Sequence, residues 1–115
     1  MKAREVHHLK AQPPTDEEIT SWIGRKATDE FGRSVGKIED VYRVGETLEW
    51  LLIRHGRSHH FLAPVKDAVG GEGSVFLPYT SEMIESAPEV RPGRLADEET
   101  LEAATEHYKL DRSRV

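Results

Sequence analysis

Two glycines and a lysine in the stretch EFGRSVGKIEDV, residues 30–41, partly match a phosphate-binding loop. Such a loop needs four residues between its first glycine and a Gly-Lys pair, then a Ser or Thr for magnesium and a following helix. Here three residues separate Gly32 from Gly36, Ile38 occupies the hydroxyl position, and the residues that follow alternate as in a strand. The stretch therefore predicts a turn leading into a strand, not a nucleotide site.

The histidines of RHGRSHH, residues 54–60, are the side chains best suited to bind a metal ion. If the loop is a three-residue hairpin turn, His55 and His59 face each other on one side, while His60 points to the other. Two ligands are fewer than the three or four that zinc normally takes. We therefore expect exposed or polar-packed histidines, with metal or small-ligand binding through His55 and His59 as the lowest alternative.

Other catalytic groups are not indicated by the sequence. The chain has no cysteine, and no serine lies in a G-x-S-x-G nucleophile elbow. The adjacent carboxylates Asp29-Glu30 and Glu39-Asp40 would point to opposite faces of a strand, so neither pair can share one acid-base site. We expect solvated charges, with Asp40 as the candidate for burial, because strand alternation points it inward with Ile38 unless a bulge intervenes near Val41. The glycine-rich VGGEGSV at 69–75 would place an acidic side chain against a phosphate, and it predicts a turn. No enzyme activity and no cofactor are expected.

Composition indicates one globular domain with polar ends. The 115 residues are 32% charged and 37% hydrophobic, with a net charge of −5. Residues 22–79 carry eight basic and eight acidic side chains, whereas residues 80–115 carry five and nine. No basic stripe is apparent, so nucleic acid is not the favoured partner. The absence of cysteine and of a long apolar run favours a cytoplasmic protein without a membrane span.

The strand and turn signals run from Trp22 to about Pro78. The spacing of glycines and of alternating apolar residues predicts strands near 24–29, 34–44, 48–55, 59–65 and 74–78, with extra pairing near 66–69. Ahead of the first strand, Thr15 and Glu18 form a potential capping box at the start of a short helix. Helices are expected in TSEMIESA and in DEETLEAATEHYKL. In the second of these, Leu101, Ala104 and Tyr108 fall on one face.

The strand at 48–55 is apolar on both faces, because Trp50 and Leu52 alternate with Leu51 and Ile53. One face can fill the interior of a curled sheet, and the other requires a cover. The C-terminal helix or a second copy of the chain could supply that cover. These four residues are therefore the candidate interface for a homodimer.

The chain also resembles the PRC-barrel domain family over residues 22–90. The resemblance rests on the first-strand Gly24, on DEFGRSVGKIEDV as a D-x-x-G-x-x-I/V-G-x-V/I-x-D-V motif, on the apolar strand from Trp50, and on APV and LPYTSEMIESAP. It implies a mainly β fold: a small, strongly bent antiparallel β-barrel followed by one or two short helices. Residues 1–21 would then be a tail with a short helix, and residues 91–115 an acidic helix and tail.

The family includes the cytoplasmic part of the photosynthetic reaction-centre H subunit, the C-terminal domain of the ribosome maturation factor, and short stand-alone bacterial and archaeal proteins. This chain is most similar to the stand-alone type. The resemblance implies a non-catalytic adaptor that binds protein partners, with structural roles for Gly24, Gly32, Gly36 and Asp40. In that reading Gly36 permits a strand bend, and Asp40 binds backbone donors near the turn. Association with RNA or the ribosome is the alternative.

Overall fold

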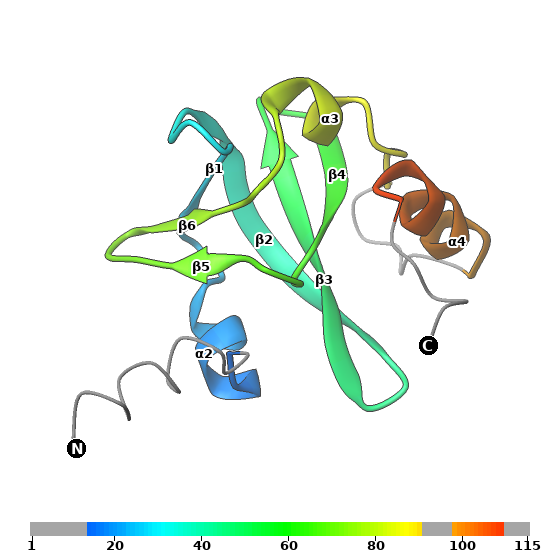
Figure 1. The fold of residues 1–115 in the computed structure, drawn as a ribbon, viewed down its shortest axis with the longest axis horizontal. Coiled ribbons are helices and arrows are strands. Elements are labelled where there is room, and N and C mark those ends of the chain that lie inside the picture. The colour runs from blue at the N-terminus through cyan, green and yellow to red at the C-terminus, as the bar shows by residue number, and fades with distance from the viewer. Residues whose placement is uncertain (1–13, 91–97, 110–115) are drawn as a thin grey trace, which may run out of the picture.

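A computed structural model of the chain describes residues 14–90 and 98–109. The expected tails before Pro13 and after Lys109 lie outside these ranges. In chain order the elements are α2 (Asp16–Ser21), β1 (Lys26–Thr28), β2 (Ser34–Val44), β3 (Thr47–His55), β4 (His59–Pro64), β5 (Val69–Gly70), β6 (Ser74–Phe76), α3 (Ser81–Glu85) and α4 (Glu98–His107) (Figure 1). Each expected strand is present, and its ends differ from the expected ones by at most two residues, apart from the short β5.

The strands form one six-stranded sheet in the order β4-β3-β2-β1-β6-β5. Most neighbours are antiparallel, but β1 pairs with β6 in parallel, with Ala27 opposite Val75. The expectation of a purely antiparallel, closed barrel is therefore wrong in two respects. The sheet is mixed, and it is open, because β4 and β5 at its two ends do not pair with each other. The parallel pair forms because the β4–β6 connection brings β6 back alongside the first strand.

The capping signals at the start of α2 and α3 act as the sequence indicates. The side chain of Thr15 accepts a hydrogen bond from the Glu18 amide, and the Glu18 carboxylate accepts one from the Thr15 amide. This confirms the capping box, which satisfies two helix-terminal donors at once. Thr80 caps α3 in a similar way by accepting from the Met83 amide. The α2 cap lets the helix place Ile19 in the core, where it is 3% exposed.

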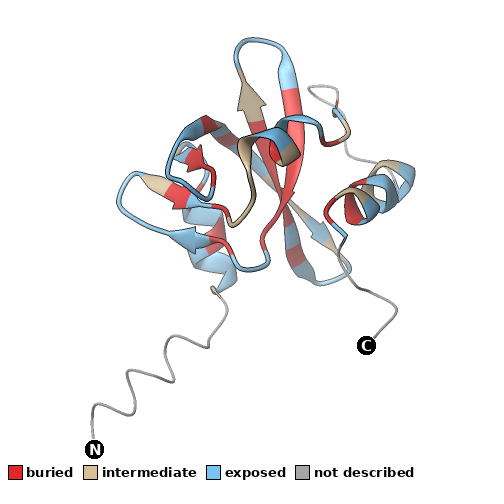
Figure 2. Cartoon of the chain, turned by 45° about the horizontal axis from the view of Figure 1, so that its top comes forward, coloured by how far each residue is buried: buried red, intermediate tan, exposed pale blue. Residues whose placement is uncertain are grey.

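The core is built around β3, whose apolar residues are buried on both faces. Trp50, Leu51, Leu52 and Ile53 are all at most 6% exposed, and buried positions continue along β4 and on the inner side of α4 (Figure 2). Tyr108, at the end of α4, lies 6.3 Å from Trp50 between ring centroids. The C-terminal helix therefore supplies at least part of the cover that this strand requires, as the face formed by Leu101, Ala104 and Tyr108 predicts.

The two edge strands differ in how they are protected. On β4, the Val90 amide donates to the His60 carbonyl at 2.9 Å, and the Tyr108 hydroxyl donates to the Leu62 carbonyl at 2.7 Å. These bonds occupy part of an edge that would otherwise be open to other chains. No strand in the described ranges pairs with the outer side of β5. Within those ranges no helix has the length and apolar character needed to cross a membrane.

Candidate functional site

Gly32 and Gly36 serve the turn and the sheet, and they do not form a phosphate loop. Gly32 has φ +83° in the turn between β1 and β2, where its amide donates to the Asp29 carbonyl. Gly36 lies opposite Ala27 inside the sheet with φ +148°. A Cβ atom there would overlap the Arg54 carbonyl oxygen and a methyl group of Ile53. Lys37 is exposed within β2. The residues after Gly36 therefore form a strand, and not the helix that a phosphate-binding loop requires.

Asp29 is the one buried carboxylate among the described residues, and sequence reasoning missed it. Its side chain is fully buried and accepts hydrogen bonds from the Phe31 and Arg33 amides at 2.9 and 2.8 Å. The Ser81 hydroxyl donates to it at 2.5 Å, and the Arg33 guanidinium at 3.1 Å. An Asp at the first position of a turn with Gly three residues later is a known signal for this geometry. The partner Ser81 gives no comparable signal.

These donors stabilise the ionised form of Asp29. The hydrogen bond from Ser81 is the largest cause that lowers the pKa of the Asp29 carboxyl, and together with the turn donors it overcomes the opposing effect of burial, leaving a pKa of about 2. A carboxylate with so low a pKa is a poor general base at neutral pH. The arrangement ties the β1–β2 turn to the start of α3, and its chemistry is structural.

Acid should reveal this role of Asp29. Because its folded-state pKa of about 2 lies below the ordinary 3.8, the carboxylate stabilises the fold above about pH 4. That stabilisation is lost as the pH falls from about 4 to about 2. We expect the free energy of unfolding, measured by urea titration, to fall more steeply over this interval in the wild type than in Asp29→Asn. The exposed neighbour provides the control Glu30→Gln, which should keep the wild-type slope. Equal slopes for wild type and Asp29→Asn would contradict this role.

Asp40 is exposed, so the expectation that it is buried beside Ile38 is wrong. Ile38 pairs with Ile53 but Asp40 pairs with Leu52, which leaves Glu39 as an extra residue in β2. This bulge re-aims the side chains that follow it. Asp40 accepts a hydrogen bond from the adjacent Val41 amide at 2.8 Å, far from the turn donors. The turn-binding role expected of it belongs to Asp29.

The histidine pair forms as predicted, without a third ligand suitably placed in the described part of the chain. His55 and His59 lie opposite each other across the β3–β4 hairpin. The Nδ1 atom of His59 is 2.5 Å from the Glu89 carboxylate, and that of His55 is 3.0 Å from the Val35 carbonyl oxygen. No group of three or more His, Asp or Glu side chains placed to hold a metal occurs within residues 14–90 and 98–109.

His60 points away from that pair and is 3% exposed. Its Nε2 atom lies 3.1 Å from one Glu39 oxygen, and the other Glu39 oxygen accepts from Arg54 at 2.7 Å. Glu39 therefore links β2, β3 and β4 at the bulge. The imidazole is buried, whereas the Glu39 and Arg54 side chains of this cluster are partly open to solvent.

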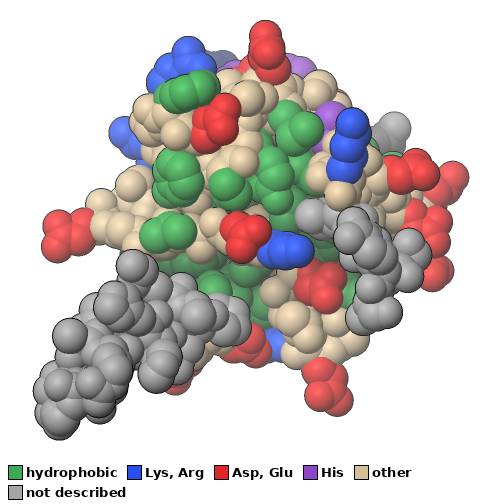
Figure 3. Space-filling model, in the orientation of Figure 1, with side chains coloured by type: hydrophobic (Ala, Val, Ile, Leu, Met, Phe, Trp, Pro, Cys, Tyr) green, Lys and Arg blue, Asp and Glu red, His purple; other side chains and the backbone are tan. Residues whose placement is uncertain are grey.

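The predicted interface residues of β3 are not at the surface of the single chain. All four lie in the core described above, so a contact between copies must use other side chains. Among the described residues, four large apolar side chains are exposed: Ile23, Phe31, Val69 and Phe76. In Figure 3, apolar side chains gather over β5, β6 and the segment that leads from β6 to α3. Sequence reasoning predicted strand pairing here but no exposed apolar face, because two short strands give little periodic signal.

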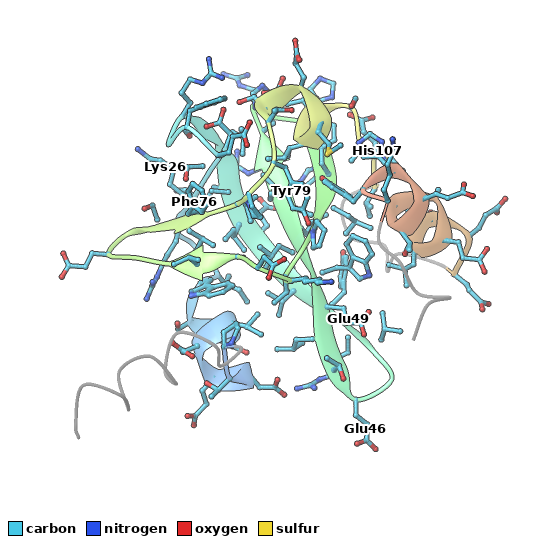
Figure 4. The ribbon with its side chains drawn as sticks, in the orientation of Figure 1. Lys26, Glu46, Glu49, Phe76, Tyr79 and His107 are labelled. Atoms are coloured by element: carbon cyan, nitrogen blue, oxygen red, sulfur yellow. The ribbon has the colours of Figure 1, made fainter. Side chains whose placement is uncertain are left out.

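Val69 and Phe76 lie on one face of the sheet. They stand directly opposite each other in the β5–β6 pair, and they are 59% and 37% exposed. Phe76 is also in register with Thr28 of β1, and Ser74 is in register with Lys26. Residues in register share a face, so Lys26 lies on the same side as Val69 and Phe76. We call Val69, Phe76 and Lys26 the β5–β1 face. Figure 4 shows Lys26 and Phe76 at this end of the sheet.

Comparison with known proteins adds no assignment. No family model matches the chain, and no curated protein matches it.

Proposed function

We propose that the chain is a non-catalytic protein-interaction module of the PRC-barrel type, which self-associates through the β5–β1 face. The sequence motif from Asp29 to Val41 and the mainly β fold support the family assignment. We also propose that the sheet is strongly bent in the manner of a PRC-barrel, although its two edge strands, β4 and β5, do not pair to close a barrel.

One observation carries the proposal: two large apolar side chains are exposed side by side at an unpaired sheet edge. Val69 and Phe76 face each other across a hairpin whose outer strand has no neighbour in the described ranges. Exposed apolar groups that form a contiguous patch mark interaction sites more often than isolated ones do. Aromatic residues are also enriched in the cores of protein interfaces. A partner that covers this face would bury both side chains.

A glutamate in this face should weaken self-association without unfolding the chain. We expect Phe76→Glu to lower the weight-average mass measured by light scattering across a micromolar concentration series, because a charge would be desolvated in the contact. The control Thr47→Glu places the same charge at the exposed first residue of β3, beside the β2–β3 turn and away from β5 and β6 (Figure 1). The control should match the wild type. An unchanged mass for a folded Phe76→Glu protein would remove this face from the contact.

A further inference from the structure

Cationic side chains lie in a row across three strands of the sheet. Lys26 of β1 is directly opposite Lys37 of β2, and Lys37 is directly opposite Arg54 of β3. Like charges in directly opposite positions destabilise a sheet. Glu39 neutralises Arg54 at 2.7 Å, but neither lysine has an ion-pair partner in the described part of the chain. We call Lys26 and Lys37 the lysine row; it shares its strand face with Val69 and Phe76.

The helix α4 carries the complementary pattern. Its exposed glutamates form what we call the acidic stripe: Glu98, Glu99, Glu102 and Glu106. At 3.6 residues per turn, these positions fall within an arc of about 100°. Glutamates spaced by four repel each other. The helix dipole favours acidic residues in the first turn, but it disfavours Glu106 in the last. No ion pair to these carboxylates occurs within residues 14–90 and 98–109.

Lys26 of the lysine row and the helix that carries the acidic stripe lie on opposite sides of the molecule in the view of Figures 1 and 4. No ion pair joins the two patterns within residues 14–90 and 98–109. Two molecules related by a two-fold axis can pair each row with the other molecule's stripe, so that the contact forms twice.

We infer that the partner of the β5–β1 face is a second copy of this chain, whose acidic stripe docks on the lysine row. The inference rests on the proposed self-association, and it names the surface that the face recognises. Complementary charge sets the register and orientation of the pair, while Val69 and Phe76 supply apolar contact beside it. The same lysines could attract a nucleic acid, but their number is small and the chain is acidic overall.

Reversing each half of the contact provides a direct test. In the row variant, Lys26→Glu and Lys37→Glu are combined; in the stripe variant, Glu102→Lys and Glu106→Lys are combined. Each variant alone would present like charges in both contacts, and we expect its dimer dissociation constant to rise at least about tenfold. In an equimolar mixture of the two variants, both contacts again join opposite charges. We therefore expect the mixture to associate as the wild type does, and less so at high salt.

The control and the readouts separate this inference from the proposed function. Arg57→Glu combined with Lys66→Glu changes the net charge as much as the row variant and should leave association unchanged. Circular dichroism verifies that every variant is folded. If the wild type associates and the row variant does so equally well, or if mixing restores nothing, this inference is wrong while self-association stands. A monomeric wild type overturns both. A monomer that binds single-stranded RNA through Lys26 and Lys37 would replace the second copy with nucleic acid.

Discussion

Leu51→Glu is expected to unfold the domain, and not merely to separate two copies of it. Leu51 is fully buried in the central strand, opposite Val41 on one side and Ala63 on the other. An unpaired carboxylate at such a position loses its hydration and finds no partner. The expected loss is about 4 kcal/mol or more of unfolding free energy, which is a large part of the total for a small domain.

Far-ultraviolet circular dichroism and thermal melting would measure this effect. The control is Leu51→Met, which keeps the side-chain volume and should cost less than about 1.5 kcal/mol. A Leu51→Glu protein with the wild-type melting temperature but a smaller mass in solution would mean that Leu51 lies in a contact between two copies of the chain. That outcome would contradict the burial of β3 within a single chain.

Gly36→Val is expected to have an effect of similar size for a different reason. The φ angle of +148° is one that side chains with a Cβ atom rarely adopt, and the added atom would overlap the backbone of the neighbouring strand at Arg54. The backbone cannot move aside without breaking the pairing of β2 with β3. We expect a loss of roughly 2–4 kcal/mol, and a greater loss than for Gly36→Ala.

Gly45 separates the two causes of this loss. It has φ +64° in the β2–β3 turn, and a Cβ atom there would meet nothing within 4 Å. Gly45→Ala should therefore show only the cost of the left-handed conformation, about 1 kcal/mol. Urea denaturation of both variants would compare them. Equal losses at the two positions would mean that close strand approach is not the reason for glycine at position 36.

Local patterns were sufficient to predict most elements of the fold. Turn residues and alternation located the strands, and the Thr15-Glu18 pair located the start of α2, because these signals act over a few residues. The parallel pairing of β1 with β6 was not predictable in the same way. It joins segments separated by some 48 positions, and neither strand is long enough to show its partner in its own sequence.

The candidate site was predicted less well, for two physical reasons. A single extra residue, Glu39, reversed the expected orientation of Asp40, and a bulge leaves no distinct mark on an alternating pattern. The role assigned to Asp40 belongs to Asp29, whose strongest stabilising partner, Ser81, lies 52 residues away. The lysine row could not be predicted from the sequence either, because Lys26, Lys37 and Arg54 become neighbours only when the strands pair.

Sedimentation equilibrium of the wild-type chain over a range from low to high micromolar concentration tests the proposed function most directly. If the chain is a self-associating module, its apparent mass rises from 13.0 kDa toward twice that value as the concentration increases. The rise should be smaller for Phe76→Glu and unchanged for Thr47→Glu. An apparent mass that stays at 13.0 kDa throughout would contradict self-association.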